Sequence, residues 1–131
     1  MTATAWRKLW QCVAGLLGAA GVALGAAAAH LAASGDAGHL QLASGFLIFH
    51  ALALLGVAAL TRGPAETGSG RWLKLAGVLF ALGAICFSGG LTLNQLVTQA
   101  LGPLIPVGGT ALILGWLALA VSAVADRAPL T

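Results

Sequence analysis

Four long apolar runs, separated by short polar or glycine-rich connectors, make up most of this 131-residue chain. The runs cover residues 9–31, 42–61, 72–96 and 103–125. Each of them is long enough for a helix to cross a bilayer, which takes about 20 apolar residues. The pattern predicts an all-α protein, a four-helix transmembrane bundle that forms a single integral membrane domain over residues 1–131.

The three connectors cover residues 32–41, 62–71 and 97–102. Because they are short, helices that follow one another in the chain should be antiparallel neighbours, in up-down-up-down order. The middle connector contains Pro64 and three glycines and is the clearest loop. The first connector is interpreted as a plain loop, although a short interfacial turn capped near Ser34 or Asp36 is an alternative.

The composition agrees with a membrane protein. Hydrophobic residues make up 60% of the chain and charged residues 7%, whereas a soluble domain has roughly 25% charged residues. No room is left for a catalytic head outside the bilayer. The net charge is +3, but no basic cluster is interleaved with aromatic residues, so nucleic acid is not an expected partner.

The placement of the basic residues predicts the orientation. All six fall on one side of a four-span topology: Arg7, Lys8, Arg62, Arg71, Lys74 and Arg127. The positive-inside rule places this side, with both termini, in the cytoplasm, and the expected location is a bacterial inner membrane. Trp6, Trp10 and Trp72 mark the same boundary, where indole rings prefer to lie. Trp116, deep in the fourth run, is assigned to core packing or lipid contact.

The first thirty residues also resemble a secretory signal peptide, with a basic start, an apolar stretch and the small residues at 26–29. The apolar stretch is longer than the usual 7 to 15 residues of such a signal. We therefore expect this segment to be retained as the first span.

Two cysteines, Cys12 and Cys86, lie inside apolar runs. Their spacing fits neither a metal motif nor a disulfide framework, so both are expected to be small buried side chains.

Small residues recur at helical spacing and predict close helix packing. Gly21 and Gly25 form a GxxxG pair in the first run, and Gly115 continues a similar stripe in the fourth. Such stripes fit seams within one bundle, and a homodimer surface is the alternative. The predicted packing positions are Gly21, Gly25, Gly89, Gly90, Pro106, Gly108, Gly109 and Gly115.

Polar side chains within the runs gather in the outer half of the predicted bundle, away from the basic residues. They form a candidate polar site: His30, His50, Ser88, Asn94 and Thr110. His50 is predicted about 12 Å below the outer start of the second run. One interpretation makes His50 a structural hydrogen-bond hub that, with Thr110, ties the second span to a broken, proline-rich start of the fourth. His39, in the first connector, is expected to be solvated.

The alternative interpretation makes His30 and His50 ligands of a metal, haem or quinone, or members of a proton relay. No aspartate or glutamate lies in any run to complete such a relay. We therefore favour the structural hub and expect no resident metal or cofactor.

Four motifs resemble one known family. They are LGAAAAHL at 24–31, FHALALLG at 49–56, LFALGAICFSGGL at 79–91 and PLIPVGGTALILGW at 103–116. In order and spacing they are similar to the small four-span family called domain of unknown function 423, whose animal relative is called transmembrane protein 256. The resemblance implies a four-helix integral membrane protein and brings no established activity. The family pattern has a glycine in place of Ala28, and a tyrosine or glutamine where Ile48 and Phe49 stand here.

The leading functional hypothesis is a non-enzymatic structural or accessory component that associates with lipid, with a larger membrane complex or with copies of itself. It rests on the lack of a catalytic carboxylate or nucleophile pair. The alternative is a small-solute, haem, metal or quinone site built from the five polar residues. A transporter protomer is a third possibility, but four helices without an internal repeat would have to oligomerise to enclose a pathway.

Overall fold

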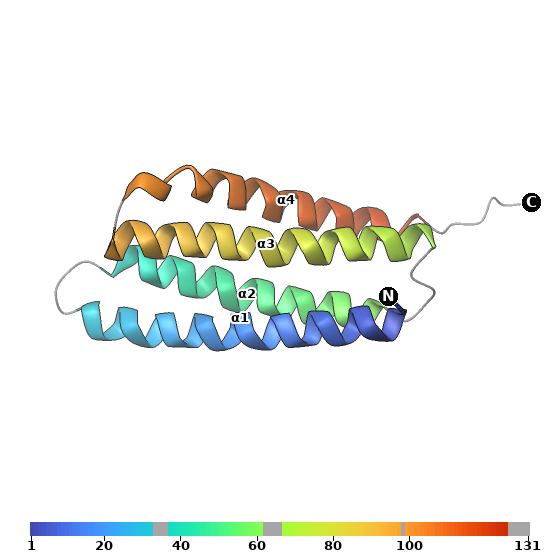
Figure 1. The fold of residues 1–131 in the computed structure, drawn as a ribbon, viewed down its shortest axis with the longest axis horizontal. Coiled ribbons are helices and arrows are strands. Elements are labelled where there is room, and N and C mark those ends of the chain that lie inside the picture. Colours follow the sequence, from blue (N-terminus) through green and yellow to red (C-terminus); the bar gives the residue numbers. More distant parts are fainter. Residues whose placement is uncertain (33–36, 62–66, 98, 126–131) are drawn as a thin grey trace, which may run out of the picture.

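The computed structural model describes residues 1–32, 37–61, 67–97 and 99–125. Its four long helices run antiparallel to their neighbours in the chain (Figure 1). They are α1 (Ala3–Leu31), α2 (Gly38–Leu60), α3 (Gly68–Leu96) and α4 (Leu104–Ser122), and the short 3₁₀ helix η2 (Gln99–Leu101) precedes α4. All four long helices are long and apolar enough to cross a membrane. The predicted all-α, up-down-up-down transmembrane bundle is confirmed.

Helices α1, α2 and α3 begin four to six residues before the predicted apolar runs, whereas α4 begins one residue after the start of its run. The side chain of Thr2 accepts a hydrogen bond from the backbone N–H of Ala5 (3.2 Å), and Thr67 caps α3 in the same way. Helix α4 ends at Ser122, three residues before the predicted end of the fourth run. The alternative turn near Ser34 or Asp36 lies outside the described residues.

Two predicted backbone irregularities do not break the helices. Helix α3 is continuous through Gly89 and Gly90. Pro106 lies in the first turn of α4, where the missing N–H of a proline has no helical partner to lose. The start of the fourth helix is therefore regular rather than broken.

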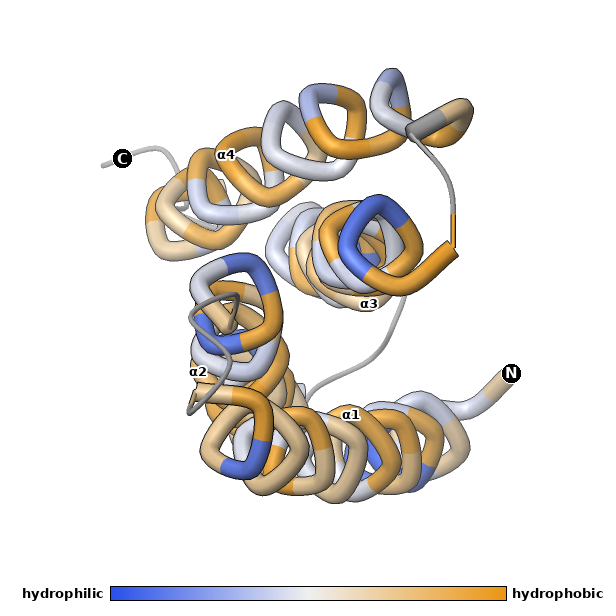
Figure 2. The backbone as a smooth tube through the Cα atoms, turned by 90° about the vertical axis from the view of Figure 1, so that its left-hand side faces the viewer, coloured by the Kyte–Doolittle hydropathy of each residue, from blue (hydrophilic) through white to orange (hydrophobic). Residues whose placement is uncertain are grey.

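Seen end-on, the four helices follow one another in an open zigzag rather than closing into a square, and α2 and α4 lie on the same side of α3 (Figure 2). Helix α2 packs against α1 and α3, and α4 packs against α3, whereas the backbones of α2 and α4 come close to each other at few points. The end where α1 and α3 begin is called the charged end, because Arg7, Lys8, Arg71 and Lys74 lie in the first two turns of these helices. The end where α2 and α4 begin is called the opposite end.

The predicted glycine seam of α1 lies within the molecule. A Cβ atom at Gly21 would come within 2.7 Å of Ile48 on α2, and one at Gly25 within 2.9 Å of the Ser44 hydroxyl. The hydroxyl of Ser44 also donates to the Gly21 carbonyl (2.7 Å). These glycines therefore let α1 and α2 approach closely.

The glycines of α3 and α4 differ from one another in their contacts. Gly90 faces Ile105, Gly115 faces Phe80, and a Cβ at Gly108 would collide with the backbone of Phe87. Gly89 has open space beside it, Gly109 has only ordinary contacts with the ring of Phe87, and Pro106 is exposed. Only some of the predicted packing positions are therefore tight contacts.

The burial of three cysteine and tryptophan side chains bears on the predictions made from the sequence. Cys12 is exposed on the surface of α1 and Cys86 is half-buried, so the expectation of two buried cysteines is wrong for Cys12. Trp10, predicted beside the basic residues at the inner boundary, is 3% exposed, and its ring packs against Gly77 of α3. The absence of a side chain at Gly77 leaves the space that this ring fills.

Candidate functional site

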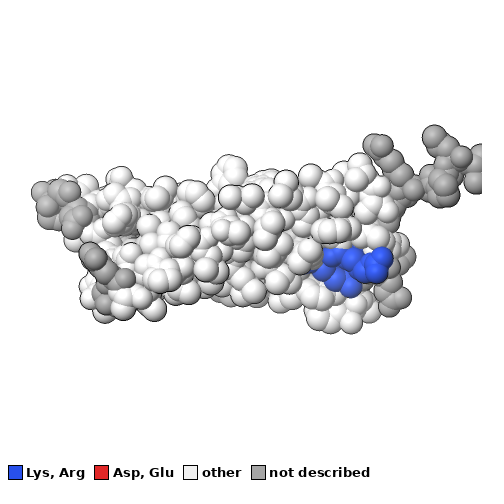
Figure 3. Space-filling view, turned by 90° about the horizontal axis from the view of Figure 1, so that it is seen from above, with Lys and Arg blue, Asp and Glu red and all other residues white. Residues whose placement is uncertain are grey.

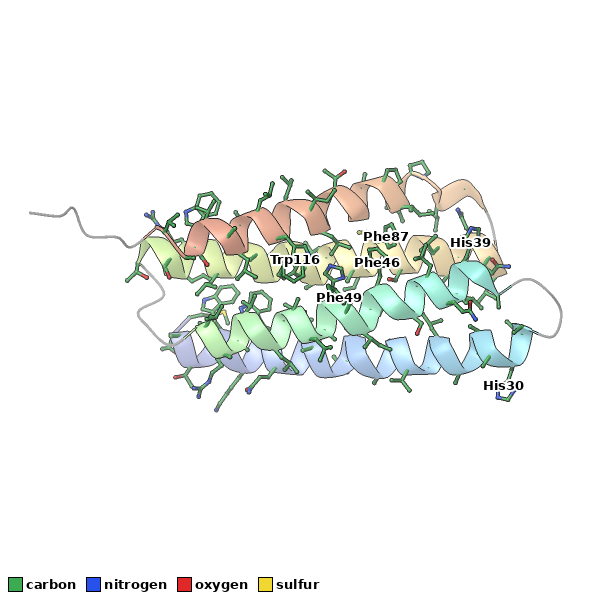
Figure 4. The ribbon with its side chains drawn as sticks, turned by 180° about the vertical axis from the view of Figure 1, so that it is seen from behind. His30, His39, Phe46, Phe49, Phe87 and Trp116 are labelled. Carbon is green, nitrogen blue, oxygen red and sulfur yellow. The ribbon has the colours of Figure 1, made fainter. Side chains whose placement is uncertain are left out.

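A groove lies between α2 and α4 and has α3 as its floor, and we call it the α2–α4 groove. Its cavity volume is about 620 Å³. It is lined by Gln41, Leu42, Gly45, Phe46, Phe49 and His50 of α2, Phe87 of α3, and Gly109, Leu112, Ile113 and Trp116 of α4. Figure 4 shows Phe46, Phe49, Phe87 and Trp116 together in the middle of the helices.

The groove exists because α2 and α4 both pack on α3 while their backbones stay apart from each other. Two facing glycines widen it. A Cβ at Gly45 of α2 would have no atom within 4 Å, and a Cβ at Gly109 of α4 would lie 3.6 Å from the Phe87 ring. Side chains are therefore missing from both walls at the level of the aromatic floor.

Aromatic rings form the floor of the groove and its inner end, which is the end near the middle of the helices. The ring centres of Phe46 and Phe87 are 4.4 Å apart, and those of Phe80 and Trp116 are 4.9 Å apart in an edge-to-face arrangement. The His50 ring lies among them, 5.6 Å from Phe80. The separations of 4.9 and 5.6 Å fall in the range of favourable aromatic pairs, about 4.5–7 Å, and the Phe46–Phe87 separation lies at its lower edge.

Both ring nitrogens of His50 have partners. Nδ1 lies 2.8 Å from the carbonyl oxygen of Phe46, and the indole N–H of Trp116 points at Nε2 over 3.3 Å. Because a carbonyl only accepts and an indole N–H only donates, this network assigns the proton to Nδ1 and leaves Nε2 as the acceptor. His50 is thus a neutral imidazole that connects α2 to α4.

This connection agrees with the predicted hub but uses a different partner. The Thr110 hydroxyl donates to the Pro106 carbonyl of its own helix (2.8 Å), a common choice for a threonine inside a helix. Trp116, which was assigned to packing or lipid contact, is the residue that bonds His50. His50 lies about 18 Å from the start of α2, because the helix begins at Gly38, four residues before the predicted run.

The structure does not bring the five candidate polar residues into one site. The Ser88 hydroxyl donates to the Ala43 carbonyl (3.0 Å) and joins α3 to α2. Asn94 has a buried side-chain oxygen without a hydrogen-bond partner in the described part of the chain. His30 is exposed at the end of α1 and points away from the other helices (Figure 4).

Two polar contacts between helices were not predicted. Ser44 bonds the Gly21 carbonyl directly beside the point where Ser88 bonds Ala43, so α2 is tied to both neighbours at one level. His39 lies 3.0 Å from the side-chain oxygen of Gln95, so this exposed histidine has a partner on α3. A search for hydroxyl residues at the level of a glycine stripe in the preceding run would have found Ser44.

Residues 1–32, 37–61, 67–97 and 99–125 offer few side chains that could bind a metal ion. Within these ranges no three His, Cys, Asp or Glu side chains come close enough to hold an ion. The groove itself is lined almost wholly by apolar and aromatic side chains. Its chemistry is that of a site for an apolar molecule.

Four transmembrane helices with a lateral apolar groove define a small integral membrane protein. A family model described as "Protein of unknown function (DUF423)" matches residues 24–109, and the chain belongs to this family. The matched range contains His50 and Phe87 and ends before Trp116.

Curated relatives support the same assignment. The "UPF0382 inner membrane protein YgdD" of Escherichia coli (strain K12) is 32% identical over 108 residues, which cover 79% of this chain and 79% of the relative. The protein of the same name from Shigella flexneri matches equally well. No solved structure matches the chain significantly. The resemblance found in the sequence motifs is therefore confirmed.

Proposed function

We propose that this protein is a non-enzymatic accessory component of the inner membrane that holds an apolar lipid chain in the α2–α4 groove. The observation that carries the proposal is the groove itself, a cavity of about 620 Å³ with walls from two helices that do not pack together. Its size lies within the range of ordinary small-molecule sites, roughly 300–1,000 Å³.

The position of the groove selects a lipid chain over a water-soluble ligand. Its walls run along α2 from Gln41 to His50, a length of about 14 Å, within the membrane-spanning part of the helix. Water has almost no polar partner on such walls. An acyl or isoprenoid chain from the surrounding bilayer can enter sideways and contact Phe46, Phe49 and Phe87.

One polar side chain lies where the groove reaches the membrane surface. Gln41 is exposed, lines the groove and follows the start of α2 by three residues. Its amide offers two donors and an acceptor to the linkage that joins a lipid chain to its headgroup. The groove therefore has a polar mouth and an apolar interior, as a lipid molecule requires.

A haem or metal site has less support. Both nitrogens of His50 are engaged within the protein, and His30 lies apart from the groove. To bind iron, Nε2 would have to release the Trp116 N–H. A quinone could still use the groove through its isoprenoid tail, which is one of the lipid chains that the proposal includes.

The experiment is native mass spectrometry of the protein purified in mild detergent, with extraction of the lipids that remain bound. Gly45→Leu places a side chain in the groove, and Gly56→Leu, also on α2 and also in open space, is the matched control. Wild type and Gly56→Leu should retain at least one lipid per chain, and Gly45→Leu should retain less. Equal retention by all three proteins would remove the basis of the proposal.

The inner membrane location and the orientation are part of the same proposal. The relatives are named as inner membrane proteins, and the basic residues of α1 and α3 gather at the charged end. The positive-inside rule then places this end in the cytoplasm. Green fluorescent protein fused to the C-terminus should fluoresce and alkaline phosphatase fused there should be inactive; the reverse pattern would contradict the orientation.

The accessory role is tested separately by crosslinking in intact membranes. A reproducible product with another membrane protein, or with a second copy of the chain, is the expected result. A chain that remains uncrosslinked and runs as a monomer after mild solubilisation would contradict an accessory role and leave the lipid site to be judged on its own.

A further inference from the structure

A second surface, at the charged end, is independent of the groove. Arg7 and Lys8 of α1 and Arg71 of α3 are exposed, and Lys74 of α3 is half-buried. Figure 3 shows Lys and Arg side chains together at this end on the face that it draws. We call the four residues the basic surface.

The α1 and α3 parts of this surface are held together by aromatic packing. The ring of Trp10 fills the space above Gly77, and the ring centres of Trp6 and Trp10 are 5.3 Å apart. The ammonium group of Lys74 lies 5.5 Å from the centre of the Trp6 ring, a cation–π contact between α3 and α1. Lys74 is therefore positioned next to the helix that contains Arg7 and Lys8.

Helix length places the basic surface at the level of the lipid headgroups. Helices α1 and α3 have 29 residues each and are about 43 Å long, whereas the hydrocarbon core of a bilayer is about 30 Å thick. Lys74, the deepest of the four, lies about 9 Å from the start of α3. The excess length is enough to hold all four cations in the headgroup layer.

The charge of this surface is not balanced within the part of the chain that the structure describes, which contains no aspartate or glutamate. Over the whole sequence, six basic residues belong to the charged side of the topology, and the acidic residues there are Glu66 and Asp126. Arginine and lysine side chains bind phosphate groups through charge-assisted hydrogen bonds. Phospholipid phosphates are the anions present at this depth.

We propose that Arg7, Lys8, Arg71 and Lys74 bind the headgroup phosphate of an anionic phospholipid in the leaflet at the charged end. The Lys74 contact with Trp6 holds one cation in place, and the exposed arginine and lysine side chains close around the phosphate. The site lies at the opposite membrane surface from the mouth of the α2–α4 groove, so the two sites bind separate lipid molecules.

The test compares binding of phosphatidylglycerol and phosphatidylcholine to the full-length protein by native mass spectrometry. Arg71→Gln/Lys74→Gln removes two charges, and Arg71→Lys/Lys74→Arg retains them. A juxtamembrane cation contributes about fivefold to the attraction for anionic lipid. The neutral pair should therefore lower the phosphatidylglycerol preference about 25-fold, whereas the charge-retaining pair should keep most of it.

A second neutral pair, Arg7→Gln/Lys8→Gln, gives the same test on α1 in case the α3 variant does not fold. If either double glutamine variant folds and still prefers phosphatidylglycerol as strongly as the wild type does, the proposed phosphate site is wrong. Displacement of phosphatidylglycerol by millimolar inorganic phosphate would also overturn it, because the proposed ligand is a lipid. Gly45→Leu should leave the preference intact, which separates this proposal from that of the groove.

Discussion

Trp116 of α4 donates its indole N–H to Nε2 of His50 on α2 over 3.3 Å. These residues lie on helices that each pack on α3 and hardly touch each other, so their hydrogen bond bridges the inner end of the α2–α4 groove. Because the Phe46 carbonyl occupies the other side of the imidazole, His50 is satisfied as a neutral group at mid-membrane depth.

Replacing Trp116 with phenylalanine tests the hydrogen bond while keeping an aromatic ring beside Phe80. The variant should lose about 0.6 kcal/mol of unfolding free energy, the average for hydrogen bonds between membrane helices. Unfolding in detergent, followed by circular dichroism, measures the change. Trp72→Phe, at the charged end, is the control, and equal stability of the two variants would contradict the bridge.

Replacing His50 with alanine should have a larger effect, because it removes two hydrogen bonds and the ring contacts with Phe46 and Phe80. A loss of about 2 kcal/mol is expected. His30→Ala, on the exposed end of α1, should change stability by less than about 0.5 kcal/mol. The thermal midpoint of each purified variant measures the change. Negligible effects at both positions would contradict the role of His50 as a structural hydrogen-bond hub.

Two adjacent glycines of α4 should respond differently to the same substitution. Gly108→Ala places a methyl group against the backbone of Phe87, so α3 and α4 must separate. Gly109→Ala meets only the Phe87 ring at an ordinary distance. We expect about 1–3 kcal/mol of destabilisation for the first and less than about 0.5 kcal/mol for the second. Similar unfolding curves would mean that α3 and α4 are not packed as described.

The seam between α1 and α2 predicts a similar contrast. Gly21→Val should destabilise the fold by about 1–3 kcal/mol, because its Cβ would approach Ile48 within 2.7 Å. Gly15→Val, where the space is open, should be nearly neutral. Size-exclusion chromatography of both variants in detergent adds a second readout. A change in oligomeric state at Gly21 without loss of stability would favour the homodimer surface instead.

The order and direction of the helices could be predicted from the sequence because apolar runs of about 20 residues have few alternatives in lipid. The hydrogen-bond partners of the polar side chains could not be predicted in this way. Spacing gives the depth of a residue along its own helix, but the partner depends on rotation and on where the helix begins. Thr110 was expected to help His50 tie the second span to the fourth, but its hydroxyl turns back to its own helix, and Trp116 bonds His50 instead.

The groove was not predicted either, for a related reason. It arises because the backbones of α2 and α4 do not approach each other closely, and because Gly45 and Gly109 lie on facing walls. The pattern of apolar and polar positions along a chain does not show how far apart two helices lie when they are not neighbours in the sequence. In the sequence, Phe46, Phe49 and Phe87 are simply apolar residues of two different runs, and only the fold brings them together in one groove.

The most direct measurement of the central claim uses a phospholipid with a photoreactive group in its acyl chain, incorporated into membranes that contain the protein. After illumination, mass spectrometry of peptides identifies the labelled residues. We predict labelling concentrated on the α2 segment 41–50 and the α4 segment 109–116, reduced by Gly45→Leu and unchanged by Gly56→Leu. Labelling spread evenly over the lipid-facing surfaces of all four helices, and insensitive to Gly45→Leu, would contradict a lipid site in the groove.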